Sequence, residues 1–274
     1  MTTPKTGLRP MATTRSRRRN SGRVLVALPV FNECRFVAGV LQAVRRHARD
    51  ILVVDDGSTD GTGRILESQA GIRVIRHSAN AGYGRSLIDA FDYAGRHGFE
   101  WVLTIDCDRQ HEPACIRRFY RRIVADRADI ISGSRYLHVM DRGSVRPPPE
   151  RVAINRAISR LLNRHVSLHL TDAFCGFKAY RTEAIASLTL DEPGYGLPLQ
   201  IWVQAGRAGL RIEEVPVPLI YHDRRRNFAG PLEDPRQRVQ YYLSVIESEL
   251  GYHVRCEIDE LLCSGADKHG LRRA

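Results

Sequence analysis

Short apolar runs alternate with segments of helical periodicity along the first half of the chain. Runs rich in Val, Leu and Ile, typical of buried strands, lie at residues 23–30, 51–54, 72–75, 101–105 and 129–132. Between them apolar side chains recur three and four positions apart, which predicts helices at residues 33–48, 62–70, 84–96 and 113–125. Strands and helices that alternate through short loops predict an α/β fold, with a Rossmann-like, mostly parallel central sheet flanked by helices.

The alternation changes after residue 133. Three consecutive prolines predict a long loop over residues 137–150. An extended segment at residues 212–221 contains Pro216 and Pro218, which cannot donate ladder hydrogen bonds, so we expect it at a sheet edge. A further short strand is predicted at residues 177–181, and helices at residues 151–163, 197–208 and 239–250.

Length and composition indicate one globular domain with tails. The 274 residues are 43% hydrophobic and 27% charged, which suffices for a sizeable core. We predict a disordered basic arm at residues 1–22, a single domain at residues 23–250 and a polar tail at residues 251–274. No apolar run is long enough to span a bilayer, and no secretory signal pattern follows the N-terminus. We therefore expect a cytoplasmic protein, either soluble or peripheral on the cytoplasmic face of a membrane.

The chain is strongly basic, with a formal net charge of +11. Part of this charge lies in the N-terminal arm, where five arginines crowd between residues 15 and 23. A solvated tail is the favoured interpretation, with attraction to anionic lipid or nonspecific contact with nucleic acid as alternatives. Because no helix-turn-helix, zinc-finger or RNA-recognition signature occurs and only 7% of residues are aromatic, no specific nucleic-acid partner is expected.

Polar clusters follow three of the predicted strands at the point where each strand ends. They are Asn32-Glu33, Asp55-Asp56 and Asp106-Cys107-Asp108. The carboxyl ends of parallel strands meet at one edge of a sheet, so these carboxylates should converge on one crevice. Carboxylates brought together repel one another unless a cation neutralises them. The pattern therefore predicts Mg²⁺ or Mn²⁺ held by Asp106 and Asp108 and shared with a diphosphate.

Other interpretations of these segments stay open. The aspartates could cap the helix that begins near Pro113. Residues 56–67 come near the spacing of an EF-hand calcium loop, although an apolar strand and not a helix precedes them. Cys107, His111 and Cys115 could suggest zinc, but no fourth ligand stands nearby. A nucleotidyltransferase would show a glycine- and lysine-rich loop after the first strand, and no such loop occurs.

Eight segments recur in the order of one known enzyme family and cover nearly all of residues 23–225. They are LPVFNE (28–33), VVDDGSTDGT (53–62), NAGYGRSLIDAF (80–91), TIDCDRQHEP (104–113), GSRY (133–136), INRAISRLLN (154–163), DAFCGFKAYR (172–181) and EEVPVPLIYHDR (213–224). In these segments the chain resembles the inverting family-two glycosyltransferases of the GT-A fold, and among them the dolichyl- or polyprenyl-phosphate mannose synthase branch. The resemblance implies metal-dependent transfer of a hexose from a nucleotide-sugar donor, such as GDP-mannose, UDP-glucose or UDP-GlcNAc.

The resemblance also implies roles for individual residues. Those that match the donor-binding set are Pro29, Phe31, Glu33, Asp56 and Asp106. Those that match the metal ligands are Asp106, Asp108 and Gln110. Those that match basic groups holding the acceptor or phosphates are Arg135, Arg156, Lys178 and Arg224.

The acceptor implied by the resemblance is a polyprenyl phosphate at a membrane surface. Such an acceptor is already an anion, so it needs positioning more than it needs a general base. A soluble hydroxyl acceptor is the alternative, and it would need a base, for which Asp172 and Asp191 are the candidates. Phe174 and Cys175 depart from the small polar residue and glycine common in that branch, and both changes fall on the acceptor side. A non-enzymatic nucleotide- or anion-binding protein is the remaining alternative.

Overall fold

A seven-stranded sheet forms the centre of the protein in the computed structural model, which describes residues 22–137, 147–220 and 230–264. The strand order is β3-β2-β1-β4-β6-β5-β7. The strands are β1 (Val24–Val30), β2 (Asp50–Asp55), β3 (Arg73–Arg76), β4 (Trp101–Thr104), β5 (Ile130–Ser134), β6 (Lys178–Arg181) and β7 (Ile212–Pro216). Strand β6 pairs antiparallel with both of its neighbours, and the remaining pairings are parallel. The mostly parallel sheet and the edge position of β7 are therefore confirmed.

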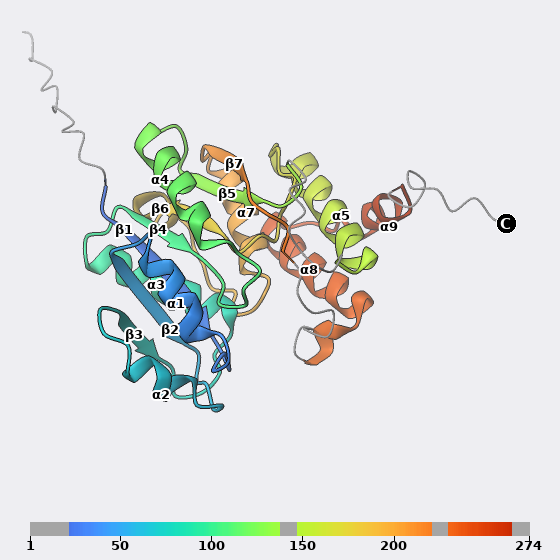
Figure 1. Cartoon of the computed structure of the whole chain (residues 1–274). Coiled ribbons are helices and arrows are strands. Elements are labelled where there is room, and N and C mark those ends of the chain that lie inside the picture. Colours follow the sequence, from blue (N-terminus) through green and yellow to red (C-terminus); the bar gives the residue numbers. More distant parts are fainter. Residues whose placement is uncertain (1–21, 138–146, 221–229, 265–274) are drawn as a thin grey trace, which may run out of the picture.

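Helices cover both faces of this sheet (Figure 1). They are α1 (Val37–Arg45), α2 (Thr62–Glu67), α3 (Tyr83–Arg96), α4 (Ile116–Ala125), α5 (Pro149–Val166), α6 (Thr182–Ile185), α7 (Leu197–Arg207), α8 (Pro235–Leu250) and α9 (Arg255–Ser264), with 3₁₀ turns η1 (Pro113–Cys115) and η2 (Gly230–Glu233). Helices α5, α8 and α9 gather at the end of the molecule away from β3 (Figure 1).

Alternate residues of the central strands face two separate cores. Leu25 and Ala27 of β1 belong to the core under α3, α5, α7 and α8, whereas Val26 and Leu28 belong to the core under α1 and α4. All four side chains are fully buried. A strand buried on both faces reads as a continuous apolar run instead of an alternating one, which is the pattern of residues 23–30.

The C-terminal part differs from expectation. Residues 239–250 were expected to form the last helix, yet α8 begins earlier, where Asp234 accepts hydrogen bonds from the N–H groups of Arg236 (2.9 Å) and Gln237 (2.8 Å). Helix α9 then follows within the expected polar tail, because Ile258 is buried and Glu257 pairs with Arg164 of α5. The division at residues 22 and 250 and the disordered state of the arm stay predictions, and residues 1–21 and 265–274 lie outside the described residues.

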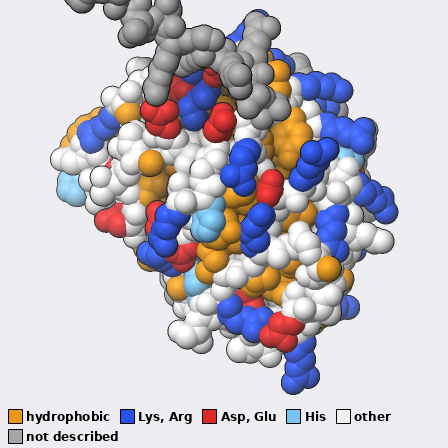
Figure 2. Space-filling view, turned by 90° about the vertical axis from the view of Figure 1, so that its left-hand side faces the viewer, with side chains coloured by type: hydrophobic (Ala, Val, Ile, Leu, Met, Phe, Trp, Pro, Cys, Tyr) orange, Lys and Arg blue, Asp and Glu red, His pale blue; other side chains and the backbone are white. Residues whose placement is uncertain are grey.

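Lys and Arg side chains are spread over the face in Figure 2, with apolar and neutral surface between them. Among the described residues, no helix combines the length and apolar character needed to cross a bilayer.

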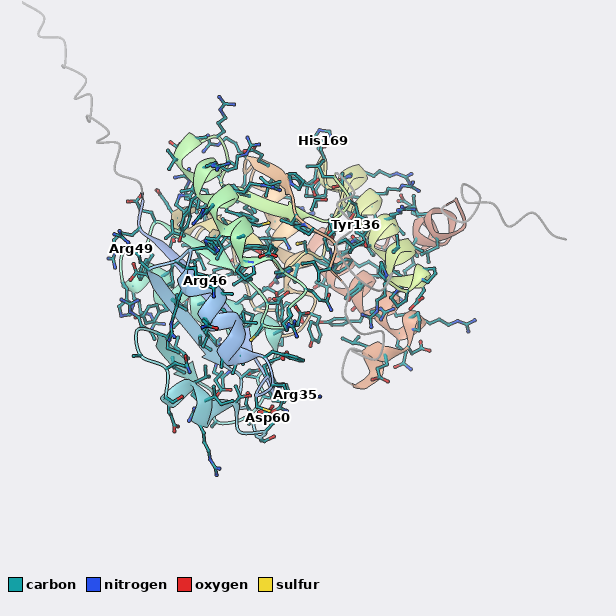
Figure 3. The ribbon with its side chains drawn as sticks, viewed as in Figure 1. Arg35, Arg46, Arg49, Asp60, Tyr136 and His169 are labelled. Atoms are coloured by element: carbon teal, nitrogen blue, oxygen red, sulfur yellow. The ribbon has the colours of Figure 1, made fainter. Side chains whose placement is uncertain are left out.

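The loop after β2 is tied to the loop after β1. Asn32 N–H donates to Ser58 Oγ (2.9 Å), Glu33 N–H to Thr62 Oγ1 (2.9 Å) and Cys34 N–H to Asp60 Oδ2 (3.0 Å). Figure 3 places Asp60 beside Arg35 at this corner. Burial would raise the pKa of the Asp60 carboxyl, but hydrogen bonds from Thr62 and Cys34 hold it well below its usual range. These bonds occupy the loop oxygens with the chain's own donors, which argues against the EF-hand alternative.

Gly57 allows this loop to turn next to the segment after β3. Its φ is +72°, and a Cβ there would lie 2.5 Å from the carbonyl carbon of Ala79. Gly71 has nearly the same φ, +73°, but no atom within 4 Å of its notional Cβ. An alanine would therefore have the same unfavourable backbone conformation at the two positions. Only at position 57 would its Cβ also clash with neighbouring atoms.

We predict that Gly57→Ala lowers the free energy of unfolding by about 2–4 kcal/mol, whereas Gly71→Ala lowers it by only about 1 kcal/mol. Urea denaturation of both variants measures the difference. Equal losses would mean that the close approach of Ala79 is not what requires glycine at position 57.

Candidate functional site

A cavity of about 630 Å³ lies at the carboxyl ends of the parallel strands. Its walls come from the loops after β1, β2, β4 and β5, from α5 and α8, and from the segment around Tyr195. The polar clusters that the sequence placed at three strand ends contribute Glu33, Asp56, Asp106 and Asp108 to this lining. The expected convergence on one crevice is therefore present.

Asp106 and Asp108 form the acidic floor of the cavity just beyond β4. Tyr83 donates its hydroxyl proton to Asp106 Oδ1 (3.1 Å), and Gln110 N–H donates to Asp108 Oδ1 (2.9 Å). Gly176 lies against the Asp106 carboxylate so closely that any Cβ there would overlap it. The Asp106 side chain is 26% exposed, so it reaches the cavity without being freely solvated.

Burial and the neighbouring charge of Asp106 raise the pKa of the Asp108 carboxyl to about 7. Within the described residues, no group of three or more His, Cys, Asp or Glu side chains is placed to hold a metal. The carboxylates of Asp106 and Asp108 and the amide of Gln110 nevertheless line the same cavity. Their oxygens suit a hard divalent cation that completes its coordination shell with phosphate oxygens.

His111 supports this loop and does not form a zinc site. Its Nδ1 accepts the backbone N–H of Asp106 (3.1 Å), so the proton of a neutral ring sits on Nε2. Burial lowers the pKa of His111, which keeps the ring neutral. Its Nε2 lies 3.9 Å from Cys175 Sγ, and His111 packs beside Phe177. The described residues thus give no support to the zinc alternative.

Asp56 lines the same cavity and is held by backbone N–H groups and by His77. Its Oδ1 accepts from Ala81 N–H (2.7 Å) and contacts His77 Nδ1 (2.7 Å), and its Oδ2 accepts from Gly82 N–H (2.9 Å). The residue is only 3% exposed but still lines the cavity. Pro29, Phe31 and Glu33 line the same cavity, and Phe31 is 42% exposed. The predicted donor-binding set therefore lies together.

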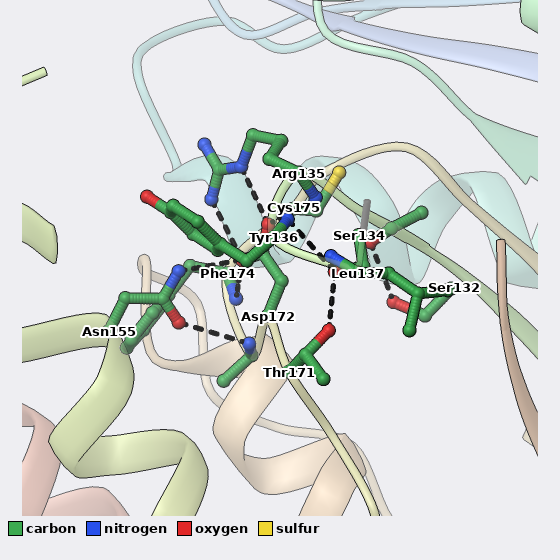
Figure 4. A network of polar contacts seen from close by, with 12 residues as sticks. Ser132, Ser134, Arg135, Tyr136, Leu137, Asn155, Thr171, Asp172, Phe174 and Cys175 are labelled. Carbon is green, nitrogen blue, oxygen red and sulfur yellow. Dashed lines mark hydrogen bonds and ion pairs between the residues drawn. The ribbon is translucent and has the colours of Figure 1, made fainter. Parts of the chain in front are cut away.

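Arg135 enters the cavity from the end of β5 and is fixed by Asp172 (Figure 4). Arg135 Nε donates to Asp172 Oδ2 (2.7 Å) and Nη2 to Oδ1 (2.8 Å), and Asn155 Nδ2 also donates to Oδ1 (2.8 Å). Burial would raise the pKa of the Asp172 carboxyl, but the Arg135 charge holds it at about 2. Glu214 of β7 anchors this loop by accepting from Thr171 N–H (2.9 Å).

These contacts decide what Asp172 can do. Its side chain is fully buried, and its oxygens already accept from Arg135 and Asn155. A general base needs a lone pair directed at the substrate. The geometry therefore makes Asp172 a positioning residue for Arg135 in place of the base that a hydroxyl acceptor would need. Asp191, the other candidate base, is exposed, does not line the cavity and accepts from Gln200 Nε2 (2.6 Å).

Of the other basic residues in the predicted acceptor set, the two that the structure describes, Arg156 and Lys178, are not in the cavity lining. Arg156 is exposed on α5. Lys178 is buried, where its Nζ donates to the Cys175 carbonyl and lies 5.3 Å from the Trp202 ring centroid. Arg224 lies outside the described residues.

The cavity also contains residues that the sequence analysis did not identify. Arg151 of α5 and Arg238 of α8 join Arg135 in the lining, and both charges act on the Tyr242 hydroxyl. Tyr195 stacks on Tyr83, with ring centroids 5.6 Å apart. No local pattern marks these positions, because tertiary packing brings them there: Arg151 with α5, Arg238 with α8 and Tyr195 with the segment before α7.

Comparison with known proteins places the chain in context. Residues 25–189 match the family model described as Glycosyl transferase family 2. An undecaprenyl-phosphate mannosyltransferase of Micrococcus luteus is 30% identical over 207 residues, covering 72% of this chain and 84% of that protein. A polyprenol monophosphomannose synthase of Mycolicibacterium smegmatis is 29% identical over 210 residues, covering 73% and 78%.

Solved structures share the fold. Glucosyl-3-phosphoglycerate synthase from Mycobacterium tuberculosis, crystallised with Mn²⁺, UDP and glucosyl-3-phosphoglycerate, superposes with a TM-score of 0.65. The match covers 85% of this chain and 81% of that chain at 20% sequence identity. It confirms the GT-A fold predicted from the motifs.

The raised pKa of Asp108 predicts a pH-dependent stability without metal. The carboxyl pKa moves from 3.8 to about 7 on folding, so the folded protein binds more protons than the unfolded chain between those values and loses stability as pH rises. We expect Asp108→Asn to increase the free energy of unfolding in EDTA by about 1–3 kcal/mol at pH 8, with no increase at pH 4.

Denaturant titrations at the two pH values measure this effect. Asp92→Asn is the matched control, because Asp92 is an exposed aspartate of α3 that pairs with Arg96 (3.4 Å) outside the cavity. If Asp108→Asn increased the free energy of unfolding by the same amount at both pH values, the explanation would be contradicted.

Proposed function

The chain belongs to glycosyl transferase family 2 and is a glycosyltransferase, and from that premise we propose that it transfers a hexose from a nucleotide-sugar to a polyprenyl phosphate. The observation that carries the acceptor assignment is that one cavity gathers carboxylates and guanidinium groups from different elements of the fold. Carboxylates come from the ends of β1, β2 and β4, and guanidinium groups come from β5, α5 and α8. The carboxylates suit a cation with a diphosphate, and the guanidinium groups suit an anionic acceptor.

On the acidic side, Asp106, Asp108 and Gln110 would hold Mg²⁺ or Mn²⁺. When bound, such an ion neutralises the charge that develops on the leaving diphosphate. Pro29, Phe31, Glu33 and Asp56 would hold the nucleoside, with Asp56 accepting a hydrogen bond from a base N–H. The solved relatives crystallised with UDP and Mn²⁺ or Mg²⁺ support this donor arrangement.

On the basic side, Arg135, Arg151 and Arg238 would orient the acceptor phosphate. The acceptor oxygen bonds to the anomeric carbon as the bond from that carbon to the diphosphate breaks, so the configuration inverts. Because a phosphate monoester is already ionised, no base has to remove a proton. This agrees with an Asp172 carboxylate that is fully engaged by Arg135 and Asn155.

Apolar groups in the lining of the same cavity suit a prenyl chain more than a sugar hydroxyl. They include Ile154, Phe174, Pro198 and Leu219. Phe174, which departs from the small residue common in the resembled branch, packs on Tyr242 with ring centroids 4.7 Å apart. The names of the two bacterial relatives support the same acceptor class, and a lipid acceptor would bring the enzyme to the cytoplasmic face of a membrane.

The function is tested by a transfer assay with GDP-mannose, UDP-glucose and UDP-GlcNAc, each with Mn²⁺ or with EDTA. With polyprenyl phosphate and Mn²⁺, we expect one of the donors to yield a glycosylated lipid. We expect no product with the corresponding polyprenol, and no product in EDTA. The structural neighbour crystallised with phosphoglyceric acid supplies a further arm, in which 3-phosphoglycerate replaces the lipid. Transfer to polyprenol or to 3-phosphoglycerate, with none to polyprenyl phosphate, would contradict the acceptor assignment.

Two arginines of α5 give a matched test of the role of the basic groups in the cavity. Arg151 lines the cavity, whereas Arg156 on the same helix is exposed and does not. Loss of a charged hydrogen bond to phosphate should raise the acceptor KM of Arg151→Ala about tenfold or more. Steady-state kinetics should show little change for Arg156→Ala, and the donor KM should stay near that of the unmodified enzyme in both. A larger increase of the acceptor KM in Arg156→Ala than in Arg151→Ala would mean that the acceptor phosphate binds elsewhere.

A further inference from the structure

His77, just beyond β3, lies between two carboxylates. Its Nδ1 is 2.7 Å from Asp56 Oδ1, and its Nε2 is 2.7 Å from Asp89 Oδ2 on α3. The His77 side chain is 13% exposed, and those of Asp56 and Asp89 are 5% and 17% exposed. The imidazole therefore links a cavity residue to a helix through a partly buried bridge.

The other contacts of the two carboxylates fix the protonation of this bridge. Asp56 also accepts two backbone N–H groups, from Ala81 and Gly82, and Asp89 also accepts from the Arg85 guanidinium, with Nε 3.2 Å from Oδ2. Carboxyl groups are ordinarily ionised near neutral pH. An ionised carboxylate only accepts hydrogen bonds, and a neutral imidazole can donate only one. Both short contacts can be hydrogen bonds only if both ring nitrogens of His77 carry protons.

We propose that His77 acts as an imidazolium that positions Asp56 for the nucleoside, so that binding of the donor requires the charged form of His77. This rests on the proposed function for the nature of the ligand. The three donors from His77, Ala81 and Gly82 take three of the four lone-pair directions of Asp56, which leaves one on Oδ2. Asp56 lines the cavity, so that remaining lone pair is the one that can accept a base N–H.

The surrounding charges determine the direction of the pH dependence. Burial would lower the pKa of His77, but the hydrogen bonds and charges of Asp56 and Asp89 raise it above the ordinary 6.5. Arg85 faces Asp89, and Arg76, the preceding residue, is directed at Asp55 and Glu67 instead. The bridge therefore stabilises the fold fully below pH 6.5 and is lost as pH rises through the folded-state pKa. Deprotonated His77 would turn a lone pair toward one of the two carboxylates. Asp56 would lose its donor in the form whose remaining proton, on Nε2, is directed at the Asp89 oxygen that also accepts from Arg85.

The charge of His77 can be measured without substrate. Nitrogen-15 NMR of the imidazole in the full chain should show both ring nitrogens protonated at pH 6.5 and a single titration above that value. His97 provides an internal comparison, because its Nδ1 contacts the Tyr93 carbonyl (2.8 Å) at the exposed end of α3 and, within the described residues, no carboxylate pairs with its ring. A neutral His77 at pH 6.5 would overturn the proposal whatever the protein binds.

Binding of uridine and guanosine in metal-free buffer then tests the positioning role. These probes lack a diphosphate, so the proposed metal site at Asp106 and Asp108 contributes little to their binding. For the better-bound nucleoside, we expect the dissociation constant to rise about tenfold as pH passes the NMR pKa of His77. In His77→Gln the nucleoside should bind weakly at every pH. The dissociation constant of His97→Gln should change with pH as it does in the unmodified protein.

A second variant separates positioning from folding. In Asp89→Asn the amide can donate to a neutral His77 Nε2, so Nδ1–H can still donate to Asp56 without any charge. We expect this variant to bind the nucleoside with the pH dependence removed. Persistence of the full pH dependence in His77→Gln or Asp89→Asn would overturn the proposal. Failure of both nucleosides to bind the unmodified protein at any pH would refute the proposed donor site, and with it the positioning role, even if the NMR shows a charged His77.

Discussion

The repulsion between two carboxylates in a confined, poorly solvated cavity is the constraint on which the rest of the site depends. Asp106 and Asp108 follow β4 directly, and burial together with their mutual charge raises the Asp108 pKa to about 7. Such an arrangement lowers stability unless a cation or ligand neutralises it. The surrounding chain supports the geometry: Tyr83 donates to one carboxylate, His111 accepts the backbone N–H beside it, and Gly176 leaves room for it.

An ion pair positions the basic groups of the cavity. A buried carboxylate, Asp172, holds the guanidinium of Arg135, and Glu214 and Asn155 fix the position of that carboxylate in turn. Buried ionic groups of this kind are expensive to bring together, and losing one partner leaves the other uncompensated. Their concentration around one cavity of the fold therefore points to recognition of charged ligands and not to stabilisation of the fold.

Much of the architecture could be predicted from local patterns. Runs such as residues 23–30 are buried on both faces, so composition alone marked them as strands, and the topology then placed the polar clusters of β1, β2 and β4 at one edge. Local pattern also predicted the strand at residues 177–181 and the edge segment at residues 212–221, but not that β6 lies antiparallel between β4 and β5. Helix α9 was missed because only a few apolar residues, such as Ile258, secure it against α5.

Side-chain pairing could not be predicted in the same way. The sequence offered Asp172 as a base, but whether a carboxylate is available depends on an arginine 37 positions away in the chain. It also favoured Arg156 over Arg151, although five residues along a helix turn the side chain by roughly 140°. Arg238 entered the site only through the packing of α8, which follows the segment matched by the family model. These are consequences of tertiary contacts that no local pattern encodes.

The central claim is that Asp106 and Asp108 share a divalent cation with the diphosphate of the donor. Anomalous diffraction from crystals grown with Mn²⁺ and the preferred nucleoside diphosphate tests it most directly. The account predicts one strong manganese peak within coordination distance of an Asp108 oxygen and of diphosphate oxygens, with the nucleoside beside Asp56. A nucleotide bound elsewhere, or bound in this cavity with no manganese beside either aspartate, would contradict it.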